Sequence, residues 1–367
     1  MGERARTRAL VTAAALRSRL TPRAAPGPLR RVLVAHNLLL GDTLMLTPLL
    51  AKLRANHADA DIVLLAAPAA VTLYGGRPYG VRALPFKPAD SSTARALLAE
   101  KPFDLAIVVG DNRYSWLAAA MRARHVVAHS GDRPWTKDLF VDEQRDYARQ
   151  PSAWGDMVAA LADGADPAPY RRGDWPPPAA APFELPRSPY VVLHLGASTP
   201  LKLWPAQRWM ALAEHFAERG FGIVWSAGPG EEPLVAQSDP AGRFRSCAGT
   251  LDLPQMWRLL SEAALLVVPD TGIAHLGRAT WTPTVAIFGP GSATLCAPGQ
   301  FWRDTPWRAV TVEDFPCRDQ RLLFRREVDW VRRCARTTRE CAEPRCMQAV
   351  SVADVIRSVE SLQVMAP

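Results

Sequence analysis

Short, uninterrupted apolar segments alternate with helix-like segments along this chain of 367 residues, and the alternation occurs twice. Segments that are apolar on both faces are typical of a parallel β-sheet covered by helices on each side. The expected strands are 31–36, 62–67, 103–110 and 125–129 in the first half, and 190–196, 221–228, 264–270 and 283–289 in the second. The pattern therefore predicts an α/β protein with two parallel sheets.

The segments between the strands carry apolar residues at helical spacing. The expected helices are 43–56, 113–123, 205–220, 253–263, 271–280 and 352–362. A chain of this length usually forms two domains, each with its own core. Its hydrophobic content of 48% and charged content of 22% are those of an ordinary globular protein, which excludes a disordered or fibrous chain.

A proline-rich segment separates the two alternating halves. Residues 164–188 contain seven prolines and almost no periodicity, which indicates a linker. The expected regions are an Arg/Ala-rich extension (1–28), a first α/β domain (29–165), a linker (166–188), a second α/β domain (189–350) and a C-terminal helix (351–367). In such folds ligands bind at the carboxyl ends of the strands, and two such domains place a cleft between two sheets.

The positive charge of this chain is concentrated at one end. The net charge is +8, and residues 1–31 contain eight arginines and one acid, so the rest of the chain is nearly neutral. A nucleic-acid-binding protein usually spreads basic residues over a folded face, so DNA and RNA are not expected ligands. Residues 1–28 fit either a disordered tail or a helix on an anionic membrane, whose apolar stripe would be Leu10, Val11, Ala14 and Leu20.

Metal binding and membrane spanning are not expected. Cys317, Cys334, Cys341 and Cys346 lack the CxxC spacing of zinc sites, so structural thiols or a local disulfide are favoured over a metal. The acidic pair at 59 and 61 precedes a strand and therefore lies at the amino end of the sheet. Residues 279–302 are uncharged but interrupted by proline and glycine. No secretory signal is evident, and we expect a cytoplasmic protein, peripheral on the membrane at most.

The clearest candidate site is VVPDTGIAH, which leads from a strand into a helix. The first turn of that helix offers free backbone N–H groups and a positive dipole end, which suit a phosphate. Asp270 at the strand tip could accept hydrogen bonds from sugar hydroxyls, Thr271 adds a hydroxyl, Gly272 permits close approach, and His275 lies one turn on. Alternatively, Asp270 or Thr271 simply caps the helix.

Two further loops follow strands in the same half. One contains Ser198, Thr199 and Lys202, whose cation is a plausible phosphate partner, and the other ends in Glu231 and Glu232, whose carboxylates suit ribose hydroxyls. Together the three loops predict a nucleotide-diphosphate site. No GxGxxG follows the first strand of either half and no GxxxxGK[ST] occurs, which disfavours a nicotinamide-dependent oxidoreductase and a P-loop kinase.

The first half offers one catalytic candidate, Asp42. It ends the loop NLLLGD between a strand and a helix. An aspartate there is either a helix N-cap or, where it faces the other domain, a general base.

In combination these motifs resemble the family 9 glycosyltransferases, the ADP-heptose:lipopolysaccharide heptosyltransferase family. The resemblance covers residues 31–362 and depends on the order and spacing of several segments. These are RVLVAHNLLLGDTLMLTPLLAKLRA, FDLAIVVG, LKLWPAQRWMALAEHF, AGPGEE, AGTLDLPQMWRLLSEAALLVVPDTGIAHLGRAT and PTVAIFGPG.

The resemblance implies a GT-B fold, in which two Rossmann-like domains face each other across a cleft. The first would bind the acceptor and the second the nucleotide sugar. The reaction would be an inverting, metal-independent transfer of a sugar, heptose from ADP-heptose, to a lipopolysaccharide core or other cell-surface glycan. It would take place on the inner face of the inner membrane and need no cofactor. The acceptor-binding residues cannot be named from the motifs.

The resemblance also assigns roles to residues. Asp42 would deprotonate the acceptor hydroxyl, and Lys202 with Ser198 and Thr199 would hold the donor diphosphate. Glu231 or Glu232 would contact the nucleoside. The donor sugar and phosphates would be held by Asp270, Thr271, Gly272 and His275.

The chain departs from the family pattern after His275. Arg278, Trp281 and Thr282 stand where the family usually has small residues and a glycine, which predicts an altered donor pocket. A non-catalytic relative that binds glycans or acts as a scaffold is the alternative function, although the joint presence of Asp42 and Lys202 favours an enzyme.

Overall fold

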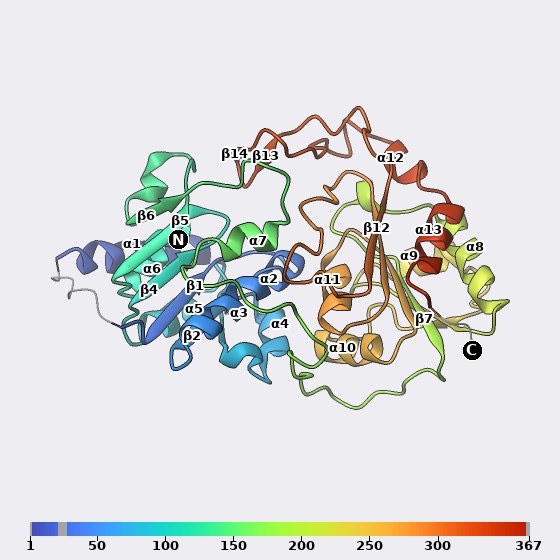
Figure 1. The fold of residues 1–367 in the computed structure, drawn as a ribbon, viewed down its shortest axis with the longest axis horizontal. Coiled ribbons are helices and arrows are strands. Elements are labelled where there is room, and N and C mark those ends of the chain that lie inside the picture. The colour runs from blue at the N-terminus through green and yellow to red at the C-terminus, as the bar shows by residue number, and fades with distance from the viewer. Residues whose placement is uncertain (1, 21–27, 365–367) are drawn as a thin grey trace. The chain divides into compact units, whose positions relative to one another are not determined.

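The computed structural model describes residues 2–20 and 28–364, which form two compact units (Figure 1). Unit 1 consists of the chain up to Ala168 together with Leu322–Trp330, and unit 2 of Pro169–Arg321 and the chain from Val331 on. Within the described ranges no helix is both long and apolar enough to cross a membrane.

Unit 1 is built on a six-stranded sheet in which all neighbouring strands are parallel. Its strands are β1 (Arg31–Ala35), β2 (Asp61–Ala66), β3 (Arg82–Pro85), β4 (Leu105–Val108), β5 (His125–His129) and β6 (Glu143–Arg145). Their order across the sheet is β3-β2-β1-β4-β5-β6, the doubly wound order of a Rossmann fold. Because the chain direction across the sheet reverses between β1 and β4, loops diverge at the carboxyl ends of these two strands.

The helices of unit 1 connect these strands. The α-helices are α1 (Glu3–Ser18), α2 (Leu40–Leu44), α3 (Thr47–Asn56), α4 (Pro68–Val71), α5 (Ser91–Leu98), α6 (Ser115–Ala120) and α7 (Trp154–Ala159). Short 3-10 turns lie at Thr72–Tyr74, Pro78–Gly80, Asn112–Tyr114 and Trp135–Asp138. The single helix expected at 43–56 is thus divided into α2 and α3.

The N-terminal segment is not a disordered tail over the residues that form α1. This helix packs against α5 and α6, with Ala15 buried and Val11 and Ala14 partly buried in the same apolar clusters. Of the predicted apolar stripe, Val11 and Ala14 thus pack partly on the protein, whereas Leu10 lines a groove and Leu20 is exposed. Residues 1 and 21–27 of the predicted extension lie outside the described residues.

Unit 2 repeats the strand order of unit 1. Its parallel strands are β7 (Tyr190–His194), β8 (Gly222–Ser226), β9 (Arg245–Ser246), β10 (Leu265–Pro269), β11 (Thr284–Phe288) and β12 (Trp307–Thr311). The order β12-β11-β10-β7-β8-β9 places the reversal between β7 and β10. The prediction of two parallel, Rossmann-like sheets is confirmed.

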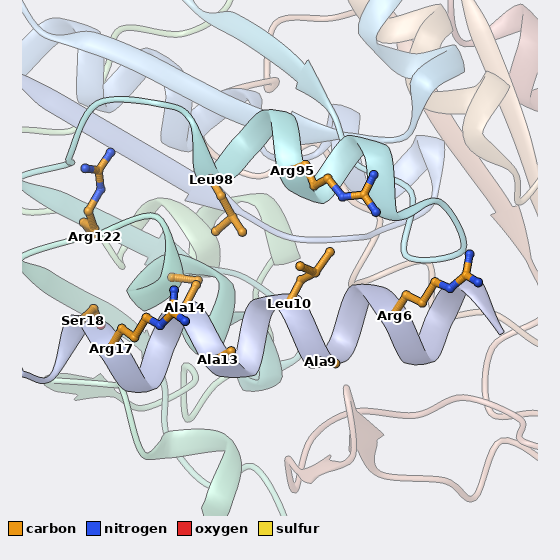
Figure 2. A pocket seen from close by; sticks show the side chains of 11 residues that line it. Arg6, Ala9, Leu10, Ala13, Ala14, Arg17, Ser18, Arg95, Leu98 and Arg122 are labelled. Atoms are coloured by element: carbon orange, nitrogen blue, oxygen red, sulfur yellow. The ribbon is translucent and has the colours of Figure 1, made fainter. Parts of the chain in front are cut away.

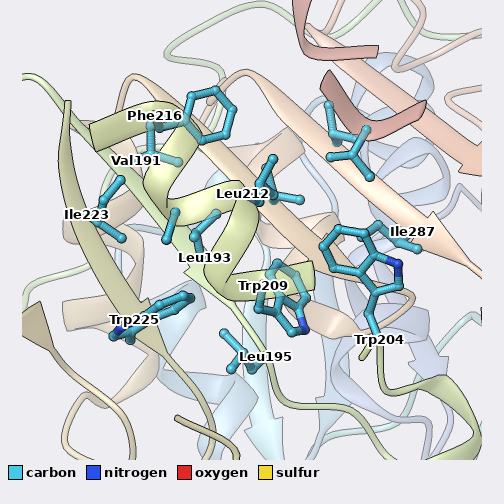
Figure 3. Close-up of a cluster of buried hydrophobic side chains, with 14 of the residues drawn as sticks. Val191, Leu193, Leu195, Trp204, Trp209, Leu212, Phe216, Ile223, Trp225 and Ile287 are labelled. Carbon is cyan, nitrogen blue, oxygen red and sulfur yellow. The ribbon is translucent and has the colours of Figure 1, made fainter. Parts of the chain in front are cut away.

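Helices cover the unit 2 sheet and close its core. They are α8 (Ala206–Ala217), α9 (Glu232–Ser238), α10 (Leu253–Ser261), α11 (Gly272–Ala279), α12 (Arg345–Gln348) and α13 (Val352–Glu360). Figure 3 shows Trp209, Leu212 and Phe216 on one face of α8, pointing at Val191 and Leu193 of β7. Burying one such side chain contributes about 1.5–3 kcal/mol, so this face fixes α8 on the sheet and hence the loop that precedes it.

Two segments without long helices or strands are anchored by large side chains. In the proline-rich segment Tyr170 and Trp175 are buried in unit 2, and the Trp175 ring lies 5.5 Å from that of Trp257.

The segment 322–330 forms the hairpin β13 (Leu322–Leu323) and β14 (Arg326–Glu327), and the buried Arg326 donates to the carbonyls of Ser130 and Gly110 at 2.8 and 2.6 Å. The sequence patterns did not predict that this hairpin belongs to unit 1.

Candidate functional site

The predicted donor residues gather at the strand reversal of unit 2. Ser198, Thr199 and Lys202 follow β7, and Asp270 and Thr271 follow β10, its neighbour in the sheet. Carboxyl ends of parallel strands meet at one edge of the sheet, and ligands of such folds bind where the order reverses. The fold thus brings together residues about 70 positions apart in the sequence.

An ion pair joins the first two loops. Lys202 Nζ lies 2.7 Å from Asp270 Oδ2 and donates to the Asp270 backbone carbonyl at 3.1 Å. Thr199 accepts a hydrogen bond from the backbone N–H of Leu201 and so caps the 3-10 turn Pro200–Lys202 that carries the lysine. The ammonium group is therefore held at the tip of β10, next to the first turn of α11.

The first turn of α11 is open to an anion. Thr271 is its N-cap and accepts from the backbone N–H of Ile273, so the capping role considered for Thr271 is confirmed and that for Asp270 is wrong. Gly272 is the first helical residue, and the remaining N–H groups of the turn bear the positive end of the helix dipole. Lys202, which is paired with Asp270, places an ammonium group beside this turn.

Gly291, which the sequence analysis did not single out, makes room for Asp270. A Cβ atom at position 291 would lie 2.1 Å from Asp270 Oδ2, so a side chain there would displace the carboxylate. The sequence feature that could have identified Gly291 is the GPG triplet directly after strand β11.

Glu231 ties the loops after β7 and β8 to each other. Its carboxylate accepts from the backbone N–H of Ala197 at 3.0 Å and from that of Gly228 at 2.7 Å. A Cβ atom at Gly196 would lie 1.8 Å from Glu231 Oε2, so only glycine permits this approach. The carboxylate is thus fixed by two backbone donors.

Glu232 points elsewhere. Its carboxylate accepts from the backbone N–H of Gly230 at 3.1 Å, and its Oε1 would lie 2.0 Å from a Cβ atom at Gly249. Hydrogen bonds from backbone N–H groups lower the pKa of this exposed side chain. Glu231 lines the pocket at this end of the sheet and Glu232 does not.

That pocket has a volume of about 230 Å³ and belongs entirely to unit 2. Ser198, Glu231 and Thr271 are the predicted residues that line it. Its remaining wall is formed by His194, Gly196, Ala197, Ala227, Gly228, Pro229, Leu251, Leu253, Met256 and Ile273. A partly apolar wall with a few fixed polar groups is typical of a small-molecule site.

Beneath the first turn of α11 lies His275, which is buried and neutral. Burial, together with the charges of Arg278 and Lys202, lowers its pKa well below the ordinary value. Arg278 Nη1 lies 3.4 Å from His275 Nδ1, and its guanidinium also donates to the Cys296 carbonyl and lies 3.8 Å from the centre of the Trp307 ring. Burial lowers the pKa of Arg278 to about 9.

Arg278, Trp281 and Thr282, the expected departures from the family pattern, do not line the pocket and lie at the C-terminal end of α11. Arg278 is buried under α11, and the Thr282 hydroxyl donates to the Leu260 carbonyl at 2.6 Å. Trp281 has a φ of 60°, a left-handed conformation that is uncommon outside glycine, and its ring lies 5.9 Å from that of Tyr170. These residues support the end of α11.

Asp42 belongs to unit 1, whereas the other predicted residues belong to unit 2. It is partly buried in the first turn of α2, at the carboxyl end of β1 and thus at the strand reversal of that unit. The N-cap of α2 is Leu39 and no side chain caps it, so the N-cap role considered for Asp42 is wrong.

Nothing in the described part of the chain forms a group of three or more His, Cys, Asp and Glu side chains able to hold a metal ion. Asp61 stands at the start of β2, as expected, and pairs with Arg31 at 3.0 Å and Arg82 at 3.3 Å.

All six cysteines are free thiols, so the local disulfide considered for the late cysteines is not formed. Burial and the neighbouring Cys334 raise the pKa of Cys317.

Comparison with known proteins shows the family to which this chain belongs. Residues 93–301 match the family described as glycosyltransferase family 9 (heptosyltransferase). Lipopolysaccharide heptosyltransferase 3 of Escherichia coli is 23% identical over 320 residues, which cover 77% of this chain and 89% of that protein. Lipopolysaccharide heptosyltransferase 1 of Pseudomonas aeruginosa is 32% identical over 133 residues, 36% of each chain, so this match spans about a third of that relative.

The fold agrees with a solved structure. The ADP-heptose lipopolysaccharide heptosyltransferase II of E. coli superimposes with a TM-score of 0.67 at 17% identity, over 91% of this chain and 98% of that one. This likeness confirms the fold class expected from the sequence. The family match covers more than half of the chain, and the chain therefore belongs to glycosyltransferase family 9, the heptosyltransferase family.

Proposed function

We propose that this protein transfers heptose from ADP-heptose to a hydroxyl of a lipopolysaccharide core or another cell-surface glycan, with inversion at the anomeric carbon and without a metal ion. The observation that carries the proposal is the Lys202–Asp270 pair at the first turn of α11. The relatives named as lipopolysaccharide heptosyltransferases, and the solved enzyme named for ADP-heptose, support the choice of donor and acceptor.

The leaving group of this reaction is a nucleoside diphosphate, whose charge grows as the glycosidic bond breaks. Positive charge held in advance at that position lowers the barrier, because no group must reorganise during the step. Lys202 and the N–H groups after Thr271 provide such charge, and Asp270 holds the lysine in place. Ser198 lines the adjoining pocket, and Gly272 leaves the helix end open to phosphate oxygens.

Glu231, not Glu232, is proposed to contact the nucleoside. Each of its carboxylate oxygens accepts one backbone hydrogen bond, and a carboxylate has about four acceptor positions in all. The positions that remain can accept hydrogen bonds from the two ribose hydroxyls. The apolar side chains of Leu251, Leu253 and Met256 in the same pocket suit the flat face of a base.

Asp42 is proposed as the general base. Its carboxylate takes the proton of the acceptor hydroxyl while that oxygen forms a bond to the anomeric carbon and the bond from this carbon to the phosphate oxygen breaks. The electron pair of the broken bond leaves with the diphosphate next to Lys202. A single displacement of this kind needs one base and inverts the anomeric centre.

Two variants and a matched control test these roles. In Asp42→Asn the turnover should fall by at least about a hundredfold, the usual worth of a general base, with ADP affinity within twofold of the original. Lys202→Ala should weaken ADP binding itself. Asp59→Asn, which removes an exposed acid at the other end of the sheet, should change neither.

Transfer from ADP-heptose and ADP binding by calorimetry are measured with and without a chelator. Near-normal turnover in Asp42→Asn would show that the base is another residue. Loss of turnover with chelator would show that the metal-free mechanism is wrong. A chain that binds glycan but transfers no sugar from any nucleotide sugar would instead be a non-catalytic relative.

A further inference from the structure

A positively charged groove lies along α1, far in the sequence from the donor pocket. It has a volume of about 700 Å³ and is formed by α1, α5 and α6 with their flanking residues. Figure 2 shows Arg6 and Arg95 towards one end and Arg17 and Arg122 towards the other, with Leu10 and Leu98 between them. The remaining lining residues are Ala9, Ala13, Ala14, Ser18 and Ala120.

The charge of this groove is not neutralised by its own lining, which contains four arginines and no acid. The nearest acid on α1 is Glu3, which pairs with Arg6 at 2.7 Å and also accepts from the hydroxyl and backbone N–H of Ser91. Arg122 donates to the backbone carbonyl of Glu100, whose carboxylate is held by two other arginines.

Arg17 and Arg95 are exposed, and within the described ranges neither side chain makes a hydrogen bond or ion pair. Two cations at opposite ends of an apolar floor are thus available to an anion. The floor itself consists of alanine and leucine side chains without an aromatic ring. Single-stranded nucleic acid is usually bound by stacking on aromatic rings, so the groove suits an anion that carries an aliphatic chain.

The helix that forms one wall of the groove is fixed to unit 1. Near its C-terminal end Arg19 donates to the Leu139 carbonyl at 2.5 Å and lies 4.5 Å from the centre of the Phe140 ring. Leu16 and Leu20 nevertheless remain 51% and 85% exposed. Two exposed leucines next to a basic groove on a fixed helix are typical of a surface that inserts shallowly into a bilayer.

We propose that the α1 groove is a docking site for the anionic phospholipids of a bilayer, with headgroup phosphates on the arginines and acyl carbons against the alanine and leucine floor. The site is separate from the proposed donor pocket in unit 2 and does not depend on which sugar is transferred. It orients unit 1 at a membrane that displays a lipid-linked acceptor.

Co-sedimentation of the full chain with vesicles tests this proposal. Vesicles of phosphatidylglycerol and phosphatidylcholine are compared with pure phosphatidylcholine, at low and high salt. The chain should bind the anionic vesicles at least tenfold more tightly, and 0.5 M salt should remove most of this preference because exposed charges are screened. In Arg17→Glu with Arg95→Glu the affinity for anionic vesicles should fall at least tenfold.

The matched control is Arg4→Glu with Arg8→Glu, which changes the net charge equally on exposed residues of the same helix that do not line the groove. It should lose less than threefold in affinity. Circular dichroism and ADP binding confirm that both variants are folded, and a failure of the proposed transferase activity would leave the vesicle result unaffected. Equal loss in both variants, or no preference for anionic vesicles, would overturn the proposal. Self-association without vesicles that only the groove variant abolishes would assign the groove to a second copy of this chain.

Discussion

Acid should destabilise this protein well above the pH at which carboxylates titrate, because four histidines are buried as neutral groups. Burial lowers the pKa of His36 and His129 to about 3 and that of His194 to about 4, and also lowers that of His275. The unfolded chain takes up a proton at each histidine below pH 6.5, whereas the folded chain does not. Stability contributed in this way is complete above pH 6.5 and is lost as the pH falls.

The size of the effect at pH 5 depends little on the folded pKa values of His36, His129 and His194, because these lie below that pH. At pH 5 the solution is about 1.5 pH units below the pKa of a histidine in the unfolded chain. Each of these buried histidines therefore costs about 2 kcal/mol of stability at this pH. His36 and His129 belong to unit 1, which should lose about 4 kcal/mol between pH 7.5 and pH 5. His194 belongs to unit 2 and should cost that unit about 2 kcal/mol, and the lowered pKa of His275 acts in the same direction. The loss in unit 1 is a large share of the usual stability of a domain.

Urea unfolding at the two pH values measures this loss. The matched variant is His129→Phe, which can keep the stack on Tyr147, where the ring centres are 4.0 Å apart. It should reduce the pH-dependent loss in unit 1 by about 2 kcal/mol. The control His125→Gln changes an exposed histidine and should leave that loss as it is. An unfolding free energy that is the same at both pH values, or an unchanged loss in His129→Phe, would refute the reasoning.

Two further predictions concern the donor pocket. Glu231→Gln should weaken ADP binding about tenfold or more, because the amide that replaces the carboxylate cannot accept from both backbone donors. Glu232→Gln should change ADP binding less than twofold. Calorimetry with ADP measures both variants, and equal effects would contradict the assignment of Glu231. Gly291→Ala should also weaken ADP binding, since its Cβ would displace the Asp270 carboxylate. The control Gly222→Ala, whose Cβ would meet only ordinary contacts in the same unit, should bind ADP normally, and the idea fails if the two alanine variants behave alike.

The central strands of both sheets could be predicted from the sequence, and the edge strands could not. The central strands are apolar on both faces because helices cover both sides, so they appear as continuous apolar runs. Edge strands such as β6 (Glu143–Arg145) and β9 (Arg245–Ser246) are short, polar and partly or fully exposed. Short, polar edge strands avoid unwanted pairing with the sheets of other molecules. Because they are short and polar, they also lack the continuous apolar run by which a strand is recognised in the sequence.

The candidate site could be predicted to the level of loops but not of side-chain direction. Three loops follow neighbouring parallel strands, so their proximity follows from topology alone. The choice between Glu231 and Glu232 depends on how one turn folds over Gly196, and no periodic pattern encodes that. The need for glycine at position 291 depends on the close approach of the Asp270 carboxylate, which is a contact between segments distant in the sequence.

Arg278 shows how a departure from the family pattern can leave the pocket lining intact. Its guanidinium donates to the Cys296 carbonyl and lies over the Trp307 ring, which offsets part of the cost of burying a charge under α11, although its Nε has no hydrogen-bond partner among the described residues. Because an arginine only donates, the nitrogen of His275 that faces it must be the acceptor, and the proton of the neutral ring lies on Nε2. Within this part of unit 2, the positive charge nearest the proposed diphosphate at neutral pH is therefore that of Lys202 and the helix end, not of His275. If His275 supplied that charge, ADP binding would weaken as the pH rises from 5 to 8; with Lys202 in that role, it should not.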